Sequence, residues 1–275
     1  MTDLDISPSV GQELPERYVH LLKEVLSFSL WDGQDGAVWR GRKSAQILQR
    51  LLERRNLSVA RIISPEVRQN GQDWPRLAHT MVGAKRLDNL QECIETILLD
   101  GVPGDLIETG VWRGGSCILM RGILAAHGVE DRRVWVADSF SGLPKPDPAR
   151  YPADTGDRHH TVTELAVSLA EVKDNFRRYG LLDDQVRFLP GWFSETLPGA
   201  PIERLALMRL DGDMYSSTIE ALSALYPRLS DGGFCIIDDF GAVEGCRRAV
   251  EDFRAAEGIN APLVRIDACG AYWRR

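Results

Sequence analysis

The sequence lacks a long apolar segment. No run of hydrophobic residues approaches the roughly 20 that a membrane-spanning helix needs. Residues 1–15 also lack the basic and then apolar pattern of a signal peptide. Hydrophobic residues make up 44% and charged residues 27% of the 275 residues, the usual balance of a globular protein. We therefore expect a cytoplasmic protein without a membrane partner.

Paired cysteines and dense basic tracts are absent as well. The five cysteines are widely spaced and form no CxxC pair, which argues against a disulfide framework and against a structural zinc site. The net charge is −7, and no stretch is rich in lysine and arginine, so a nucleic-acid backbone would be repelled on average. We expect buried, unpaired thiols and no nucleic-acid partner.

The chain changes character near residue 76. Before this point, residues 15–30 carry apolar side chains at helical spacing, residues 41–57 form a second and more basic helical stretch, and no strand pattern is clear. We expect residues 1–75 to form a helical extension that covers a site or contacts another subunit of a homo-oligomer. Whether the apolar face of residues 18–28 packs on its own domain or on a second subunit is open.

After residue 86, apolar runs of strand length alternate with amphipathic segments of helix length, which is typical of a parallel sheet with helices on both faces. The expected strands are 105–111, 133–140, 185–190, 205–211 and 234–239. The expected helices are 87–100, 116–127, 163–179, 215–229 and 243–258. Residues 263–275 alternate and contain Gly270, so they predict a late hairpin with an antiparallel edge strand. Residues 76–275 thus predict one α/β domain with an open, doubly wound sheet.

The first expected strand ends in ETGVWRGG, and ligands of such sheets bind beyond the carboxyl ends of the strands. Glycines such as Gly110 allow the backbone to approach a ligand closely, and the following helix offers unpaired N–H groups. The spacing is not GxGxxG, and Glu108 would crowd a pyrophosphate. An acidic residue suits the α-ammonium group of an amino-acid-bearing cofactor instead, although Gly110 alone is also consistent with simple strand-to-helix packing.

The next two strand ends extend this cofactor hypothesis. Asp138 ends the second strand, where a carboxylate can accept two hydrogen bonds from a ribose diol. A capping or solvated loop residue is the alternative. The third strand ends in FLPGWF, whose turn can bring Trp192 or Phe193 over an adenine ring, unless the aromatic residue belongs to the core. Glu108 and Asp138 together predict an adenosyl site.

Four aspartates follow the fourth and fifth expected strands, in RLDGDMY and IIDDF. Buried carboxylates this close would repel one another, so a positive group is expected among them. Hard divalent cations take oxygen ligands, and magnesium keeps positions open for substrate oxygens. Asp211, Asp238 and Asp239 are the simplest ligand set, whereas Asp213 is as well explained as a cap of the following helix.

Residues 141–163 are long for a connection within such a fold and carry four prolines together with His159 and His160. Long loops of this kind are often functional lids. We expect a lid that orders over the substrate. The two histidines either contact substrate or assist proton removal, or they are exposed and do neither.

The motifs together resemble those of the macrocin O-methyltransferase family, whose members methylate sugar hydroxyls of glycosylated natural products such as macrolides and aminocoumarins. The resemblance covers residues 74–275 and rests on HTMVGAKRLDNLQECIE, GDLIETGVWRGGSCILMRGIL, VWVADSFSGLP, NFRRYGLLDDQVRFLPGWF, RLDGDMY, GGFCIIDDF and YWRR. It implies a class I methyltransferase fold with a seven-stranded, Rossmann-like sheet. S-adenosylmethionine as methyl donor, magnesium and a mobile lid are also implied.

The resemblance assigns roles residue by residue. Asp211 matches a metal ligand that also acts as general base, with Asp238 and Asp239 as the other ligands. The positions that match the cofactor site are Thr80 and Met81 over the cofactor, Glu108 and Gly110 at its methionine end, Asp138 and Ser139 at the ribose and Trp192 near the adenine. Ser116, where relatives often have alanine, is placed with them.

Four alternatives to a sugar O-methyltransferase remain. A catechol would offer two adjacent oxygens to the same metal. An NAD-dependent oxidoreductase shares the strand-end acids, but it should carry a cleaner glycine fingerprint and a YxxxK motif, which this sequence lacks. A phosphoryl-transfer or hydrolytic enzyme should carry a phosphate-binding loop, and none is found. A binding module without catalysis would take the adenosyl ligand alone. The acceptor's identity lies outside the recognisable motifs.

Overall fold

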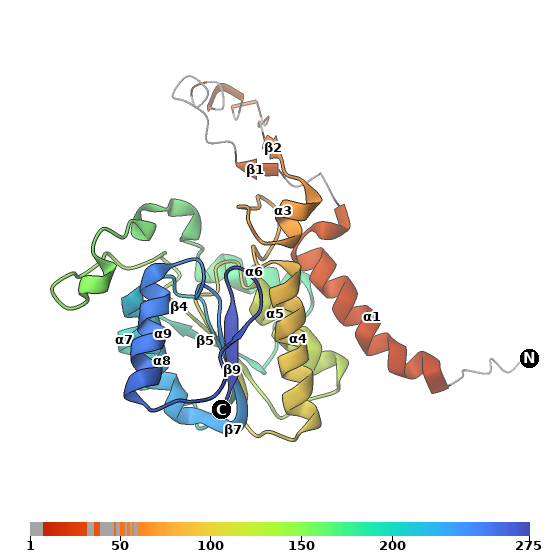
Figure 1. Ribbon diagram of the computed structural model, residues 1–275. Coiled ribbons are helices and arrows are strands. Elements are labelled where there is room, and N and C mark those ends of the chain that lie inside the picture. Colours follow the sequence, from red (N-terminus) through yellow and green to blue (C-terminus); the bar gives the residue numbers. More distant parts are fainter. Residues whose placement is uncertain are drawn as a thin grey trace, which may run out of the picture.

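Seven strands form one sheet in the order β5-β4-β3-β6-β7-β9-β8 (Figure 1). The computed structural model describes residues 8–31, 36–38, 47, 50–52, 54, 55, 57 and 60–275. Strands β3 to β7 pair in parallel, whereas β9 runs antiparallel to β7 and to β8. The strands are β3 (Asp105–Thr109), β4 (Val134–Asp138), β5 (Val186–Pro190), β6 (Leu205–Leu210), β7 (Leu229–Ile237), β8 (Val264–Arg265) and β9 (Ala271–Arg274). The predicted α/β sheet is confirmed, and the predicted hairpin supplies both antiparallel strands, with β8 at the edge.

Helices cover both faces of this sheet (Figure 1). Successive residues of a strand point to opposite faces, so Leu106 belongs to one apolar cluster and Ile107 to the other. Helices α4 (Ala84–Leu99), α5 (Gly115–Ala126) and α6 (Leu169–Arg178) contribute to the first cluster, as does α1 (Pro8–Leu26). Helices α8 (Tyr215–Leu225) and α9 (Glu244–Ala256) contribute to the second. The short α3 (Pro65–Gln69) and α7 (Phe193–Thr196) lie in connections. The expected helices are therefore present.

One predicted helix begins later than expected. Residues 163–179 were expected to be helical throughout, but α6 begins only at Leu169. Ser168 caps it, because its Oγ accepts a hydrogen bond from the Glu171 N–H at 3.2 Å. The preceding residues form the short 3-10 turns η3 (His159–Thr161) and η4 (Thr163–Leu165), so they belong to the connection after β4.

Helix α1 (Pro8–Leu26) packs on α5 of the same chain. Val19, Leu22 and Leu26 are buried in the first cluster. Gly122 of α5 makes room for this contact, since a Cβ atom there would lie 2.3 Å from Leu22 Cδ2. The apolar face that lacked an assigned partner in the sequence is thus covered by its own domain.

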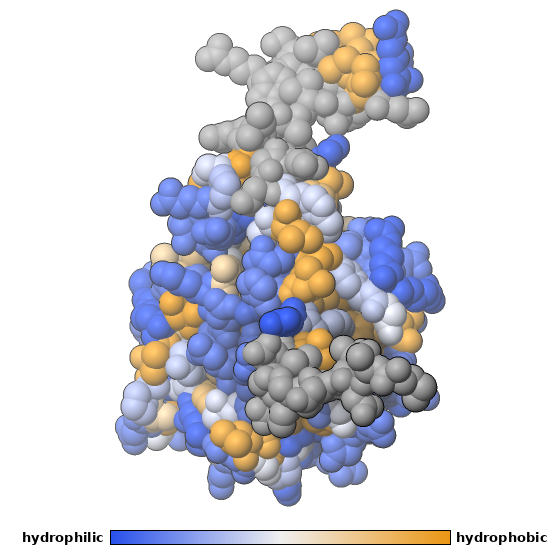
Figure 2. All heavy atoms as spheres, turned by 90° about the vertical axis from the view of Figure 1, so that its right-hand side faces the viewer, coloured by the Kyte–Doolittle hydropathy of each residue, from blue (hydrophilic) through white to orange (hydrophobic). Residues whose placement is uncertain are grey.

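Helix α1 also carries exposed apolar residues such as Leu14, Tyr18 and Leu21. Figure 2 looks onto this side of the molecule, where small apolar groups stand among charged ones. The expected homo-oligomer stays a prediction. Among the described residues, no helix combines the length and the apolar character needed to cross a bilayer.

Two short strands in the N-terminal part were missed. Strand β1 (Gly36–Val38) pairs antiparallel with β2 (Ala60–Ile62). Three residues are too few for an alternating pattern to stand out in a sequence. The helix predicted over residues 41–57 falls mostly on residues outside the described ranges.

Candidate active site

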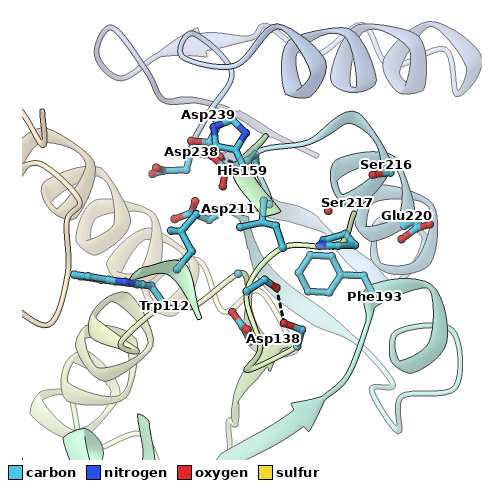
Figure 3. Close-up of a pocket in the computed structure, with 18 of the residues that line it drawn as sticks. Trp112, Asp138, His159, Phe193, Asp211, Ser216, Ser217, Glu220, Asp238 and Asp239 are labelled. Atoms are coloured by element: carbon cyan, nitrogen blue, oxygen red, sulfur yellow. Dashed lines mark hydrogen bonds between the residues drawn. The ribbon is translucent and has the colours of Figure 1, made fainter. Parts of the chain in front are cut away.

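A cavity of about 450 Å³ opens at the carboxyl ends of the parallel strands (Figure 3). This is the edge at which doubly wound sheets bind ligands, and the volume is typical of small-molecule sites. Gly110, Asp138 and Trp192 line it from the ends of β3, β4 and β5, and Asp211 and Asp238 from the ends of β6 and β7. The predicted strand-end residues therefore meet in one space.

The turn after β3 requires a glycine. Gly110 has a φ of +82°, and a Cβ atom at this position would lie 1.7 Å from the carbonyl oxygen of Asp211. The Asp211 N–H donates to the Thr109 carbonyl at 2.9 Å, so the ends of β3 and β6 are in direct contact. This close approach leaves the backbone of Gly110 on the cavity wall.

Asp138 holds the same turn from the neighbouring strand. Its Oδ2 accepts a hydrogen bond from the Val111 N–H at 2.8 Å, and its Oδ1 accepts one from the Phe140 N–H at 2.6 Å. Burial raises the pKa of this carboxyl, and the backbone N–H donors oppose that change. Asp138 lines the cavity, and a carboxylate oxygen can accept more than one hydrogen bond. Asp138 is thus both a backbone anchor and a possible acceptor for ligand hydroxyls.

The residues predicted for a cofactor divide into two groups. Met81, Gly110, Asp138, Ser139 and Trp192 line the cavity. Thr80, Glu108 and Ser116 are buried and lie outside its lining. Their proposed cofactor role stays a prediction.

Thr80 and Glu108 both form contacts with other residues of the protein. Thr80 lies against the first turn of α5, next to Gly115, and its Oγ1 accepts a hydrogen bond from the Val82 N–H at 3.1 Å. Glu108 accepts a hydrogen bond from the Cys117 thiol at 2.9 Å and forms an ion pair with Arg209. These contacts place both side chains behind the cavity wall.

The three predicted metal ligands do come together. Asp211, Asp238 and Asp239 each offer a carboxylate oxygen within 4.8 Å of the others. Figure 3 shows the three side chains converging on one side of the cavity, opposite Trp112 and Asp138. Oxygen donors at this spacing suit a hard divalent cation.

Two buried arginines reach the same acids. Arg209, on β6, forms ion pairs with Glu108, Asp211 and Asp238, the Asp211 contact being 2.8 Å long. Arg86, on α4, pairs with the other oxygen of Asp238 and, through its Nε, with Asp267 at 3.1 Å. The expected positive charge is therefore supplied in part by the protein itself.

Neither arginine was recognised as part of the site from the sequence. An arginine inside the apolar strand LALMRL was the available signal, since arginine is almost never fully buried unless it is paired. Arg86 gave a weaker signal, because amphipathic helices commonly carry arginines.

The arginines leave negative charge uncompensated. Asp239 has an ordered donor in the Asp213 N–H, at 3.2 Å, and burial together with the nearby acids raises its pKa far above the usual range. Burial and Asp238 likewise raise the pKa of Asp211 to about 8. Acids perturbed in this way are stabilised by a cation among them. The donor set thus fits the divalent metal that the sequence suggested.

The two histidines of the 141–163 loop differ in position. His159 lines the cavity, and its Nδ1 lies 2.6 Å from Asp157 Oδ2. His160 is exposed and lies outside the cavity lining. Asp213 also lines the cavity, and it does not cap α8, whose N-cap residue is Met214.

This strand order, with a glycine turn facing an acid cluster across one cavity, defines a Rossmann-like α/β protein with a cavity of small-molecule size. Residues 15–275 match the model of the macrocin O-methyltransferase (TylF) family. The chain belongs to the macrocin O-methyltransferase family, which sets aside the oxidoreductase, phosphoryl-transfer and silent-module alternatives.

Similar proteins agree with this assignment. The chain is 50% identical over 273 residues to mycinamicin III 3''-O-methyltransferase of Micromonospora griseorubida, covering 98% of this chain and 99% of the relative. It is 62% identical over 205 residues to a tetracenomycin-rhamnosyl 4'-O-methyltransferase of Streptomyces olivaceus, covering 74% and 78% of the two chains. The solved structure of the O-methyltransferase NovP superposes with a TM-score of 0.84 at 46% identity, covering 95% of this chain and 99% of that one.

Proposed function

We propose that this enzyme transfers a methyl group from S-adenosylmethionine to a sugar hydroxyl of a glycosylated natural product, with a divalent metal, in antibiotic biosynthesis. The observation that carries the proposal is the single cavity in which the Gly110–Asp138 side faces the acid cluster. Two relatives with 50% identity or more are O-methyltransferases of mycinamicin III and of a rhamnosyl-tetracenomycin. A cavity with these two sides suits a donor and an acceptor held together.

The methyl donor fits the side of the cavity formed by Gly110, Asp138, Gly191 and Trp192, which we call the glycine side. Gly110 and Gly191, both with positive φ, bring backbone to the cavity wall without a side chain. Asp138 can accept hydrogen bonds from ribose hydroxyls, and the half-exposed Trp192 can cover the adenine. These residues would bind the adenosyl part of the donor and so orient the sulfonium methyl group toward the acids. Orientation alone supplies much of the acceleration of such a transfer.

A divalent metal fits the side of the cavity formed by Asp211, Asp238 and Asp239, which we call the acid side. Asp211, Asp238 and Asp239 would hold a magnesium ion, with Arg209 and Arg86 fixing the orientation of two of these carboxylates. A bound dication stabilises the negative charge that develops on an alcohol oxygen. Asp239, which receives no arginine in the described structure, would contribute the most uncompensated charge.

Asp211 would accept the hydroxyl proton. Its side chain is 27% exposed, compared with 7% for Asp238, so it is the more accessible of the two from the cavity. One oxygen is bonded to Arg209, which positions the carboxylate. A general base removes the hydroxyl proton as the oxygen attacks the methyl group, and such a base typically contributes 10²- to 10⁴-fold to a rate.

The decisive experiment is a methylation screen with S-adenosylmethionine and magnesium against glycosylated natural products, their aglycones and simple catechols. We expect a mass gain of about 14 Da on a sugar of the glycosylated acceptors only. Asp211→Asn should lose about 10³-fold in kcat while still binding S-adenosylhomocysteine in calorimetry. Methylation of catechols alone would refute the sugar acceptor, and full activity of Asp211→Asn in EDTA would refute the metal-assisted mechanism.

A further inference from the structure

Helix α8 begins without a cap of its own. It starts directly after the Asp211–Asp213 motif, and Ser216, Ser217 and Glu220 on it line the cavity. The first N–H groups of a helix need acceptors from outside the helix. The N-cap residue is Met214, whose side chain makes no capping hydrogen bond. The helix that forms one wall of the cavity therefore depends on another segment for its start.

Asp154, from the loop after β4, supplies the missing acceptors. Its Oδ1 accepts a hydrogen bond from the Tyr215 N–H at 2.7 Å, and its Oδ2 accepts one from the Ser216 N–H at 3.0 Å. The residue is only 3% exposed. A buried carboxylate is stable here because two donors and the positive end of the helix dipole compensate its charge.

Helix α9 leaves space for this contact. A Cβ atom on Gly245 would lie 3.0 Å from the Tyr215 nitrogen and 3.4 Å from Asp154 Oδ1. The turn that carries Asp154, η2 (Pro152–Asp154), contacts both α8 and α9. Asp154 is thus enclosed by two helices rather than resting on a surface.

The same loop is attached on both sides of the cavity. On the α8 side, the Tyr151 hydroxyl donates to Glu220 Oε1 at 3.0 Å. On the cofactor side, the indole N–H of Trp112 donates to the Glu164 carbonyl at 2.9 Å. Arg150, Tyr151 and His159 of this segment line the cavity. In Figure 1 this segment is green and lies beside α8 and α9.

We propose that Asp154 is a positioning residue for the acceptor. By capping α8 from the loop, it joins Tyr151 and His159 to the cavity-facing side of α8, so that both form one rigid wall of the acceptor compartment. It does not touch the reacting atoms. The inference rests on the proposed function for the identity of the ligand, whereas the docking of the loop is independent of it.

The first test measures loop docking without any acceptor. Trypsin can cut this loop after Arg150 and Arg158, which are exposed but lie in ordered backbone. Loss of a helix cap shifts a local opening equilibrium by about tenfold. We expect Asp154→Ala to be cut about tenfold faster at these two sites, and Asp154→Asn, which retains one carbonyl acceptor, to be cut at an intermediate rate.

Thr155→Ala is the matched control. Thr155 is the exposed neighbour of Asp154, and its hydroxyl donates to the Pro152 carbonyl of the same turn, at 2.7 Å. This variant should be cut at the wild-type rate. Equal cleavage of wild type, Asp154→Ala and Thr155→Ala would overturn the docking role, as would equal acceleration in both variants.

The second test separates positioning from general stability. With an acceptor found by the methylation screen, Asp154→Ala should raise the acceptor KM about tenfold. Its kcat and its affinity for S-adenosylhomocysteine should stay within about threefold of wild type. An equal loss of cofactor affinity would show a merely structural role and overturn the inference. If no glycosylated acceptor is methylated, the proposed function fails, and the tryptic rates still decide whether Asp154 docks the loop.

Discussion

The two sides of the cavity treat their acids in opposite ways. At the end of β4, the Asp138 carboxylate is held by neutral backbone donors from Val111 and Phe140. At the ends of β6 and β7, the carboxylates of Asp211 and Asp238 face one another and are held by charged arginine side chains. The first arrangement satisfies a single acid locally, whereas the second concentrates several acids and only partly neutralises them.

The difference teaches what each side is built to receive. A carboxylate fixed by backbone N–H groups is a hydrogen-bond acceptor of defined direction, which suits the hydroxyls of an organic ligand. A cluster with remaining negative charge suits a cation. Arg209 connects the two sides, because it pairs with Glu108 on β3 as well as with Asp211 and Asp238.

The largest expected effect is a loss of stability when Arg209, which connects the two sides, is replaced. Arg209→Met leaves Glu108, Asp211 and Asp238 without their shared partner, and breaking a buried ion network typically costs about 3–5 kcal/mol. We expect a loss of this size in the free energy of unfolding, measured by urea denaturation at neutral pH.

Arg121→Met is the control for that substitution. Arg121 pairs with Asp183, which is 40% exposed, so water can compensate the loss, and the expected cost is about 1 kcal/mol or less. If Arg209→Met costs no more than Arg121→Met, the buried network does not stabilise the fold in the way described.

A smaller effect, on cofactor affinity, is expected when Asp138 on the glycine side is replaced. Asp138→Ala leaves the N–H groups of Val111 and Phe140 without their acceptor and removes the predicted ribose contact. The affinity for S-adenosylhomocysteine should fall about 10- to 100-fold in calorimetry, which corresponds to about 1–3 kcal/mol. Asp239→Asn, on the acid side, should stay within about threefold of wild type in the same titration. Equal losses in both variants would contradict the division of the cavity into two sides.

The smallest expected effect is the pH dependence of stability that His79, next to the glycine side, contributes. His79, whose carbonyl accepts the Gly115 N–H, has a pKa lowered to about 4 by burial and by Arg178 and Arg113. The unfolded chain, with an ordinary histidine pKa near 6.5, takes up the proton first as the pH falls. Stability is therefore full above about pH 6.5 and declines toward pH 4.

Because His79 is partly exposed, we expect the decline between pH 7 and pH 5 to be about 1 kcal/mol. His79→Gln should reduce this difference in urea unfolding at the two pH values. An unchanged difference would place the pH sensitivity elsewhere in the molecule.

Much of the fold was accessible from the sequence because its signals are local. Buried parallel strands appear as short apolar runs, and acids such as Asp138 and Asp211 follow directly after them. The alternation of strands and helices then places these residues at one edge. The cluster of Asp211, Asp238 and Asp239 could be predicted because these residues follow the ends of two neighbouring strands.

The remainder depends on contacts between distant segments. Arg86 meets Asp238 across 152 positions of sequence, and Asp154 meets Ser216 across 62. Neither residue stands out locally, since an arginine on a helix and an aspartate in a loop are both ordinary. Glu108 stands at a strand end, which suggested a ligand contact that stays a prediction, and its ion pair with Arg209 on another strand could not be read from the sequence.

The most direct test of the central claim, that the acid side binds a divalent cation, is calorimetric titration of the metal-free protein with Mn²⁺. The account predicts one binding site per chain that is lost in Asp239→Asn, while the affinity of that variant for S-adenosylhomocysteine is retained. Absence of binding to the wild type, or the same Mn²⁺ affinity in Asp239→Asn, would contradict it.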